Sequence, residues 1–431
     1  MTIRWVLRNR WALVMIVSLS MTASVRSGGI ETADAAFREG RFIDAEKLYR
    51  DAIGSEGETY DAVVRLGEIA LYSNRLDEAE RSLRRAVQLR PDEKRPKALL
   101  AEVYYRRDDY AQAAPLFREL GSAVFADKLA SFAGQQPYEL RMNNDVTKVK
   151  FVSTDPLPVI EGRVNGKEPV FFIIDTGGAE LILNREYGQS IGAVSFGAEK
   201  KRYAADQEAV SEQARIESFQ LGDLNIRRVP VQLLDTSRFA AAAGGRRIDG
   251  VVGTLLLNRF LFTLDYPAGQ LVLRRRTLEA SREFEEKARA ANTVTVPLWL
   301  AGDHFMVSKG RINRSEPRMF FIDTGLAGGG FLCPESTIKE AGITLSSASF
   351  EGVGGGGPVK VTPFMVDELS IGAATQRNVA SFAGAFPPSL EDRFGFRIAG
   401  LVSHAFFRPY SVTFDPLAMR MYLETRATPP P

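Results

Sequence analysis

The chain has 431 residues, which is too long for one compact domain and predicts two or three. Hydrophobic residues make up 45% and charged residues 25% of the chain, a composition typical of globular proteins. With 55 basic and 53 acidic residues the net charge is +2, so charge gives no reason to expect a nucleic acid or an anionic membrane as partner.

The first thirty residues have the layout of a secretory signal peptide. Arg4, Arg8 and Arg10 precede an apolar run over 11–21, which is too short to span a bilayer comfortably. The sequence therefore predicts a signal peptide over 1–27 and export to a periplasm or to the outside of the cell. The alternative is an uncleaved N-terminal membrane anchor.

Residues 28–127 carry a repeat with a period of 34 residues. Small residues recur at this spacing at Ala45, Ala79 and Ala113. Such residues are needed where the two helices of a pair pack nearly backbone to backbone. The pattern resembles tetratricopeptide repeats and predicts three of them, in a short helical solenoid. Such an array implies either a surface for a peptide or partner protein, or a structural or dimerisation element.

After the repeats the sequence changes to an all-β pattern of short apolar, β-branched runs broken by Gly, Pro and Asn. A polar stretch around Pro137 predicts a linker, and a charged helical stretch divides the β region in two. The predicted segments are a linker (128–147), a first β domain (148–277), a helical connector (278–294), a second β domain (295–425) and a tail (426–431).

The two predicted β domains are copies of one another. Residues 162–177 and 310–325 are identical at ten of sixteen positions at a constant offset of 148, and each copy ends in Asp-Thr-Gly. The correspondence continues downstream at an offset of 150, where Ile248-Asp249-Gly250 matches Ile398-Ala399-Gly400. Each copy therefore places an aspartate after an apolar strand and a glycine motif further on.

This pattern resembles the retropepsin and pepsin aspartic peptidases. In both copies an apolar strand runs into Asp-Thr-Gly, and Gly250 follows Asp175 by 75 residues while Gly400 follows Asp323 by 77. The resemblance covers about 150–425 and implies two tandem retropepsin-like β-barrel lobes that form a pseudo-dimer within one chain. The fold class predicted for the whole chain is thus multidomain, α-helical repeats followed by an all-β region.

The resemblance implies that Asp175 and Asp323 are the catalytic residues. Two carboxylates about 3 Å apart cannot both ionise, so they share one proton. The ionised member acts as general base toward a water, and the protonated member donates to the scissile carbonyl. The sequence therefore predicts an aspartic endopeptidase that holds a protein or peptide substrate between its lobes, beneath hairpin flaps.

The resemblance also assigns supporting roles to residues around the two aspartates. They are Thr176, Gly177, Thr324 and Gly325 in the active-site loops, the ψ-loop glycines Gly250 and Gly400, and the candidate flap residues Tyr203, Gly352, Gly354, Gly355 and Gly356. The glycine-rich segment 352–357 could instead be a flexible loop without function. Gly178 and Leu326 depart from the family pattern, which has Ala, Ser or Thr there, and this removes a possible hydroxyl contact to the aspartates.

Other chemistries find little support in the residues. Cys333 is the only cysteine, which excludes an intramolecular disulfide and a cysteine-based zinc cluster. His304 and His404 are the only histidines and lie in no catalytic motif, so structural roles are expected for both. We expect no metal, no other cofactor and no nucleic-acid partner, and a membrane only if the N-terminal segment is uncleaved.

Two further hypotheses compete with a monomeric peptidase. One is a catalytically silent peptide-binding or adaptor protein on the same fold, whose repeats bind a protein partner. Because both Asp-Thr-Gly triplets are intact, the sequence favours the enzyme. The other keeps the enzyme but joins several copies through the repeats.

Overall fold

The computed structural model describes residues 29–202, 207–354, 356–384, 386–387 and 389–425. The predicted signal peptide and C-terminal tail lie outside this part of the chain, as do the candidate flap residues Tyr203 and Gly355. No helix within the described ranges is long and apolar enough to cross a membrane.

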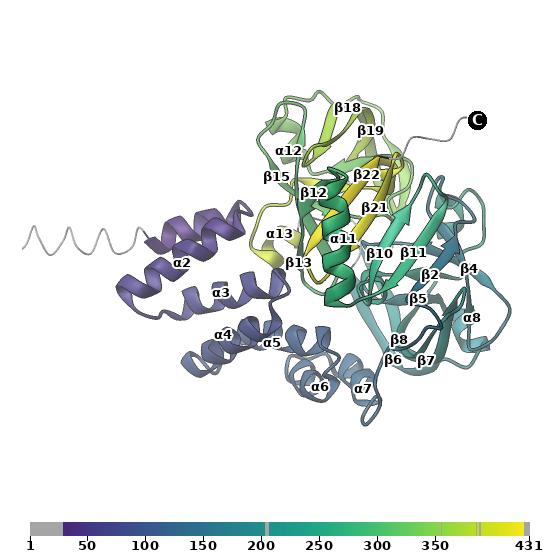
Figure 1. The fold of residues 1–431 in the computed structure, drawn as a ribbon, viewed down its shortest axis with the longest axis horizontal. Coiled ribbons are helices and arrows are strands. Elements are labelled where there is room, and N and C mark those ends of the chain that lie inside the picture. Colours follow the sequence, from purple (N-terminus) through teal and green to yellow (C-terminus); the bar gives the residue numbers. More distant parts are fainter. Residues whose placement is uncertain (1–28, 203–206, 355, 385, 388, 426–431) are drawn as a thin grey trace, which may run out of the picture.

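The N-terminal part is a helical solenoid, which runs along one side of the β region in Figure 1. A helix over 29–38 is followed by α2 (Phe42–Glu56), α3 (Tyr60–Tyr72), α4 (Leu76–Leu89), α5 (Lys94–Arg106), α6 (Tyr110–Glu119) and α7 (Ala123–Ala130). The starts of α2, α4 and α6 are spaced by the 34 residues of the sequence period. A Cβ atom at Gly67 would lie 2.8 Å from Cγ of Leu83, so the glycine lets the Leu83 side chain of α4 pack directly on the backbone of α3.

The first lobe is built on an eight-stranded sheet with the order β1-β8-β5-β9-β4-β3-β7-β6. Its strands are β1 (Glu139–Arg141), β3 (Val159–Val164), β4 (Val170–Ile174), β5 (Leu181–Asn184), β6 (Val194–Arg202), β7 (Glu208–Leu221), β8 (Leu224–Leu234) and β9 (Gly250–Val252). The short helices of this lobe are α8 (Arg185–Ser190), α9 (Phe239–Ala242) and α10 (Thr254–Leu257). Strands β6 and β7 form a long hairpin at one edge of the sheet.

The second lobe repeats this plan, with the order β13-β14-β15-β20-β16-β19-β18-β17. Its strands are β13 (Trp299–Ala301), β14 (Phe305–Ile312), β15 (Arg318–Ile322), β16 (Phe331–Cys333), β17 (Phe350–Gly354), β18 (Gly357–Ile371), β19 (Ala374–Ala383) and β20 (Gly400–Val402). Its short helices are α12 (Glu335–Glu340), α13 (Ser389–Phe394) and α14 (His404–Phe407). Strands β4 and β9 of the first lobe and β15 and β20 of the second are parallel pairs in equivalent places. The predicted fold class, helical repeats followed by a duplicated β region, is confirmed.

The lobes are not two self-contained barrels, because a third sheet takes strands from both copies. Its order is β12-β22-β21-β10-β11-β2, with β2 (Val146–Lys150), β10 (Phe260–Asp265), β11 (Gln270–Arg275), β12 (Val294–Pro297), β21 (Tyr410–Asp415) and β22 (Arg420–Thr425). At its centre Thr263 pairs with Thr413, the equivalent residue of the other copy, and their hydroxyl oxygens are 2.7 Å apart. The rings of Phe262 and Phe414 stack beside them with centroids 4.7 Å apart. The pseudo-twofold relation between the copies therefore passes through this shared sheet.

Two predicted boundaries differ from the structure. The predicted linker, 128–147, contains the end of α7 and strand β1. Strand β1 forms because Glu139–Arg141 pairs antiparallel with Asn225–Arg227 of β8, a partner far along the chain. Helix α11 (Leu278–Ala290) occupies the predicted connector, while β12 already begins at Val294.

The helical array packs against both lobes of its own chain. On the second lobe, the ring of Phe42 lies edge-on to Trp299 and Phe396, with centroids 5.5 and 5.0 Å away. On the first lobe, Asp108 forms a largely buried ion pair with Arg259. Part of the surface that the sequence offered to a partner protein is thus occupied by the β region.

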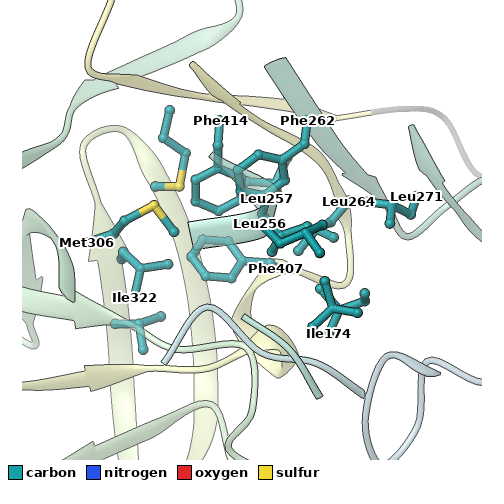
Figure 2. Close-up of a cluster of buried hydrophobic side chains, with 14 of the residues drawn as sticks. Ile174, Leu256, Leu257, Phe262, Leu264, Leu271, Met306, Ile322, Phe407 and Phe414 are labelled. Atoms are coloured by element: carbon teal, nitrogen blue, oxygen red, sulfur yellow. The ribbon is translucent and has the colours of Figure 1, made fainter. Parts of the chain in front are cut away.

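One hydrophobic cluster supports the place where the two copies meet. Figure 2 shows Ile174 and Ile322, the residues directly before the two aspartates, in the same buried cluster as Phe262 and Phe414 of the shared sheet. All four side chains are buried. Because protein cores are closely packed, this cluster holds the ends of β4 and β15 at a fixed separation.

Candidate active site

Each candidate catalytic aspartate begins a loop at the end of a central strand. The backbone N–H of Asp175 donates to the carbonyl of Val252 at 3.1 Å, and that of Asp323 donates to Val402 at 2.9 Å. These bonds extend the parallel pairs β4–β9 and β15–β20 by one residue. The same strand arrangement therefore places both carboxyl groups.

The ψ-loop glycines, Gly250 and Gly400, start the strands that position the aspartates. A Cβ atom at Gly250 would overlap the carbonyl oxygen of Ile182, and one at Gly400 would overlap the ring of Phe331. Only glycine permits this close crossing, so the structure explains both residues by packing.

The two active-site loops are joined by a crossed pair of threonines. The hydroxyl of Thr176 donates to the carbonyl of Ile322 at 2.9 Å and accepts from the N–H of Thr324 at 3.1 Å. The hydroxyl of Thr324 makes the same two bonds in return, to Ile174 at 2.9 Å and from Thr176 at 3.0 Å. Both threonines are fully buried. Four buried hydrogen bonds thus fix one loop against the other.

The two carboxyl groups lie against the opposite loops. Oδ1 of Asp175 accepts from the N–H of Gly177 at 2.7 Å, and Oδ1 of Asp323 accepts from Gly325 at 2.8 Å. A Cβ atom at Gly177 would overlap the carboxyl group of Asp323, and one at Gly325 would overlap that of Asp175. The glycines therefore make the space in which the carboxyl groups become hydrogen-bonded neighbours.

This arrangement changes the acidity of the pair. Burial first, and then the charge and the hydrogen bond of Asp175, raise the pKa of Asp323 well above its usual value, while the Gly325 N–H opposes the shift. The pair consequently holds one proton at pH values where an isolated carboxyl group is ionised.

The residues that depart from the family pattern differ between the loops. A Cβ atom at Gly178 would make an ordinary contact of 3.5 Å with Oδ2 of Asp175, so a larger residue would fit there. Leu326 instead packs against the hydrophobic cluster that contains Val359 and Val361 of β18. Neither residue brings a hydroxyl group to the aspartates.

The residues behind the two loops also differ. The hydroxyl of Thr254 donates to the carbonyl of Thr176 at 2.8 Å. The equivalent position in the second copy is His404, which is fully buried next to the backbone of Thr324. Burial, and then the neighbouring Arg408 guanidinium, lower the pKa of His404 to about 4. His404 was interpreted from the sequence as structural, and its place beside the Asp323 loop could be seen only by aligning the two copies.

Two hairpins, β6–β7 and β17–β18, project from equivalent edges of the lobes. The structure places Gly352 and Gly354 in β17 and Gly356 in the turn to β18. The hairpin ends meet, since Nε2 of Gln207 donates to the carbonyl of Pro358. A Cβ atom at Gly356 would lie 2.6 Å from that of Gln207, so the glycine permits this approach.

In the described ranges no three His, Cys, Asp or Glu side chains are grouped as they would be around a metal ion. A cavity of about 510 Å³ lies away from the aspartates, between the helical array and both lobes. Its wall carries charges of both signs, among them Glu102, Glu180, Lys201, Asp303 and Arg393.

Comparison with known proteins agrees with this architecture. Residues 160–256 match a family model described as aspartyl protease, and residues 36–103 match one described as tetratricopeptide repeat. The chain thus carries an aspartyl protease domain and tetratricopeptide repeats, as its sequence predicted. The protease match includes Asp175, whereas the relation of the second lobe to it comes from the internal duplication.

Among solved structures, the crystal structure of Basic 7S globulin from soybean is similar at 12% identity and a TM-score of 0.38. That match covers 68% of this chain and 96% of the soybean chain. No curated protein matches the sequence significantly.

Proposed function

We propose that this chain is an aspartic endopeptidase that cleaves peptide bonds with a water activated between Asp175 and Asp323. The proposal rests on one observation: each of the two carboxyl groups lies against the glycine of the opposite loop. The raised pKa of Asp323 supports it, because a shared proton is what acid and base catalysis by a carboxyl pair requires.

The proton transfers follow from this assignment. Asp175, as the ionised member, takes a proton from the water, whose oxygen forms a bond to the scissile carbonyl carbon. Asp323 gives its proton to the carbonyl oxygen, so a neutral tetrahedral diol results. Asp175 then passes its proton to the leaving nitrogen as the C–N bond breaks, and one diol hydroxyl returns a proton to Asp323. The products are a carboxylic acid and an amine, and the pair again holds one proton.

The substrate class follows from the surroundings of the pair. The hairpins β6–β7 and β17–β18 meet at Gln207 and Pro358, so an extended polypeptide would enter when these ends separate. Hairpin strands present backbone groups to an extended chain, and pockets then select alternate side chains. We therefore propose unfolded or extended protein segments as substrates, held between the lobes beneath the two hairpins.

The test is cleavage of an unfolded protein by the purified chain between pH 3 and pH 8. Asp175→Asn and Asp323→Asn should each lower kcat/KM at least a hundredfold, which is the usual share of acid and base catalysis. Asp367→Asn is a matched control, because Asp367 is an exposed aspartate of the same second lobe. A statine-type transition-state analogue should inhibit the wild type. Cleavage that survives either active-site substitution would contradict the proposal, and a folded wild type without cleavage would favour a peptide-binding protein.

We also propose that the chain is exported, on the basis of the basic and apolar residues over 1–27. Cell fractionation and N-terminal sequencing of the mature protein would test this. An intact N-terminus in the soluble cytoplasmic fraction would contradict it.

A further inference from the structure

A lysine of the helical array is buried inside the first lobe. Lys128, in α7, is fully enclosed. Its Nζ donates to both carboxylate oxygens of Glu180, at 2.8 and 2.6 Å, and to Oε1 of Gln213. A buried charge is retained only where partners compensate it, and here the partners belong to two different elements of the lobe.

The first partner, Glu180, directly follows the loop that carries Asp175. Its carboxylate also accepts from the hydroxyl of Tyr105 at 2.6 Å and from Nε2 of Gln232 at 3.0 Å. Tyr105 lies in α5, so two residues of the helical array hold this carboxylate. The backbone beside it is equally confined, because a Cβ atom at Gly253 would lie 2.5 Å from the carbonyl oxygen of Glu180.

The second partner, Gln213, lies in β7 of the first-lobe hairpin. Its Nε2 donates to Oε1 of Glu199 in β6 at 2.6 Å, and Glu199 forms an ion pair with Lys201 at 3.4 Å. Helix α7 also packs on this hairpin, since a Cβ atom at Gly197 would lie 3.2 Å from the side chain of Val124. One network therefore extends from the Asp175 loop through Lys128 to both strands of the hairpin, and it is buried at Glu180, Lys128 and Gln213.

The second lobe lacks the residue at the centre of this network. The strand pairings relate Leu181 to Phe331 at an offset of 150, so the position of Glu180 is taken by Gly330. The helical array thus contacts the active-site region of the first lobe through a charged network that the duplication does not repeat.

We propose that Lys128 is a positioning residue of the proposed peptidase, which fixes the Asp175 loop relative to the β6–β7 hairpin through Glu180 and Gln213. The helical array is then part of the machinery that arranges one half of the site. Lys128 touches neither aspartate and acts only through these two partners. This inference rests on the proposed function for its effect on cleavage, but the coupling itself can be measured without it.

Lys128 and Glu180 are both charged at mildly acid and neutral pH. Burial lowers the pKa of Lys128 to about 8, opposed by the charge of Glu180 and further lowered by Lys201. Burial alone would raise the pKa of Glu180, but Lys128, Lys201 and the hydrogen bonds from Lys128 and Tyr105 outweigh it, so its pKa is lowered. Glu199 and Lys201 are the other charged groups that face the pair. Lys128 therefore stays protonated below about pH 8. Glu180 stays ionised even when the pH falls somewhat below the ordinary pKa of a glutamate.

The experiment compares hydrogen–deuterium exchange and cleavage for four forms of the full chain. They are the wild type, Lys128→Met, the double variant Lys128→Met with Glu180→Gln, and the control Lys47→Met, which changes an exposed lysine of α2. In both Lys128 variants we expect at least tenfold faster exchange in 175–184 and 194–221, and no change in the second hairpin, 350–371. We expect kcat/KM to fall on the order of a hundredfold, as a displaced catalytic loop would cause, with a parallel loss of affinity for the statine-type analogue.

The double variant separates positioning from simple charge burial. It leaves no uncompensated carboxylate, so it should fold even if Lys128→Met does not. If Lys128 serves only to neutralise Glu180, the double variant will match the wild type in exchange and in cleavage, and the proposal is overturned. Wild-type exchange in either segment of the double variant overturns it as well. If the folded wild type does not cleave, the proposed function fails, while the exchange result still decides the coupling.

Discussion

The two copies of the β domain agree in the loops that contain the aspartates and differ in the residues that pack against those loops. The triplets Asp175–Gly177 and Asp323–Gly325 make the same hydrogen bonds, pair by pair. In the adjacent residues, Thr254 of the first lobe corresponds to His404 of the second, and Glu180, with its buried partner Lys128, corresponds to Gly330. The two copies thus keep the same hydrogen bonds in the loops that hold the aspartates and differ in the residues next to those loops. The surroundings are free to diverge and make the two halves respond differently.

The largest effect is expected from substitutions that fill the space in which the two carboxyl groups meet. Gly177→Ala and Gly325→Ala should each lower kcat/KM by about a hundredfold or more, because the new methyl group would displace the opposite aspartate. The losses should be similar, since the two contacts are equivalent. Steady-state kinetics on a peptide substrate would measure them.

Gly54→Ala is the matched control for this prediction. Gly54 lies in α2 with open space around its Cα, so the substitution should leave activity unchanged and slightly stabilise the helix. An active Gly325→Ala variant would show that the carboxyl groups do not occupy this space.

His404, which replaces Thr254 in the second lobe, should make the stability of the protein depend on pH. The pKa of His404 is lowered to about 4, so the unfolded chain binds a proton here between its ordinary pKa of about 6.5 and pH 4 while the folded chain does not. This group should therefore lower the free energy of unfolding by about 3 kcal/mol as the pH falls from 7 to 4. His404→Gln should remove that share of the acid sensitivity.

Urea denaturation of wild type and His404→Gln at pH 7 and pH 4 would measure the difference. Thr254→Ser changes the equivalent residue of the first lobe, which does not titrate, and should keep the wild-type pH dependence. Equal loss of stability in all three proteins on acidification would show that His404 is not buried in its neutral form.

The smallest expected effect concerns the position after the first triplet. Gly178→Ser should be tolerated, because its Cβ atom would lie 3.5 Å from Oδ2 of Asp175 without overlap. Its hydroxyl could donate to that oxygen and favour the ionised form, so the acid limb of the pH profile of kcat should shift to lower pH by less than about one unit. Gly178→Ala, which adds the carbon without the hydroxyl, should leave the limb in place. A shift of equal size in both variants would contradict this explanation.

The sequence predicts the repeated features of the molecule, but it does not predict strands that pair with distant parts of the chain. The 34-residue period and the two Asp-Thr-Gly triplets are periodic signals, and both were confirmed as helical repeats and an aspartyl protease domain. The pairing of Thr263 with Thr413 was visible only as two similar strands, and nothing in either strand shows that they join in one sheet. The sequence does not predict strand β1, because the strand with which it pairs lies more than eighty residues further along the chain.

Lys128 is the clearest case of a residue that sequence reasoning could not find. In the sequence it is one lysine among 55 basic residues, at the start of a segment predicted to be a linker. Its burial depends on Glu180 and Gln213, which reach it only when the array docks on the first lobe, and on the ring of Phe125 in its own helix. The one available signal was Glu180 itself, an acidic residue in an apolar stretch whose counterpart in the second copy is a glycine.

The most direct test of the central claim is a double-mutant comparison of kcat/KM for the wild type, Asp175→Asn, Asp323→Asn and the variant with both substitutions. Groups that act as one unit lose nearly all their effect with the first substitution. We predict that the double variant is no more than a few-fold less active than either single variant. Losses that multiply in the double variant, or a single variant that keeps most of its activity, would show that the two carboxyl groups do not act as one shared pair.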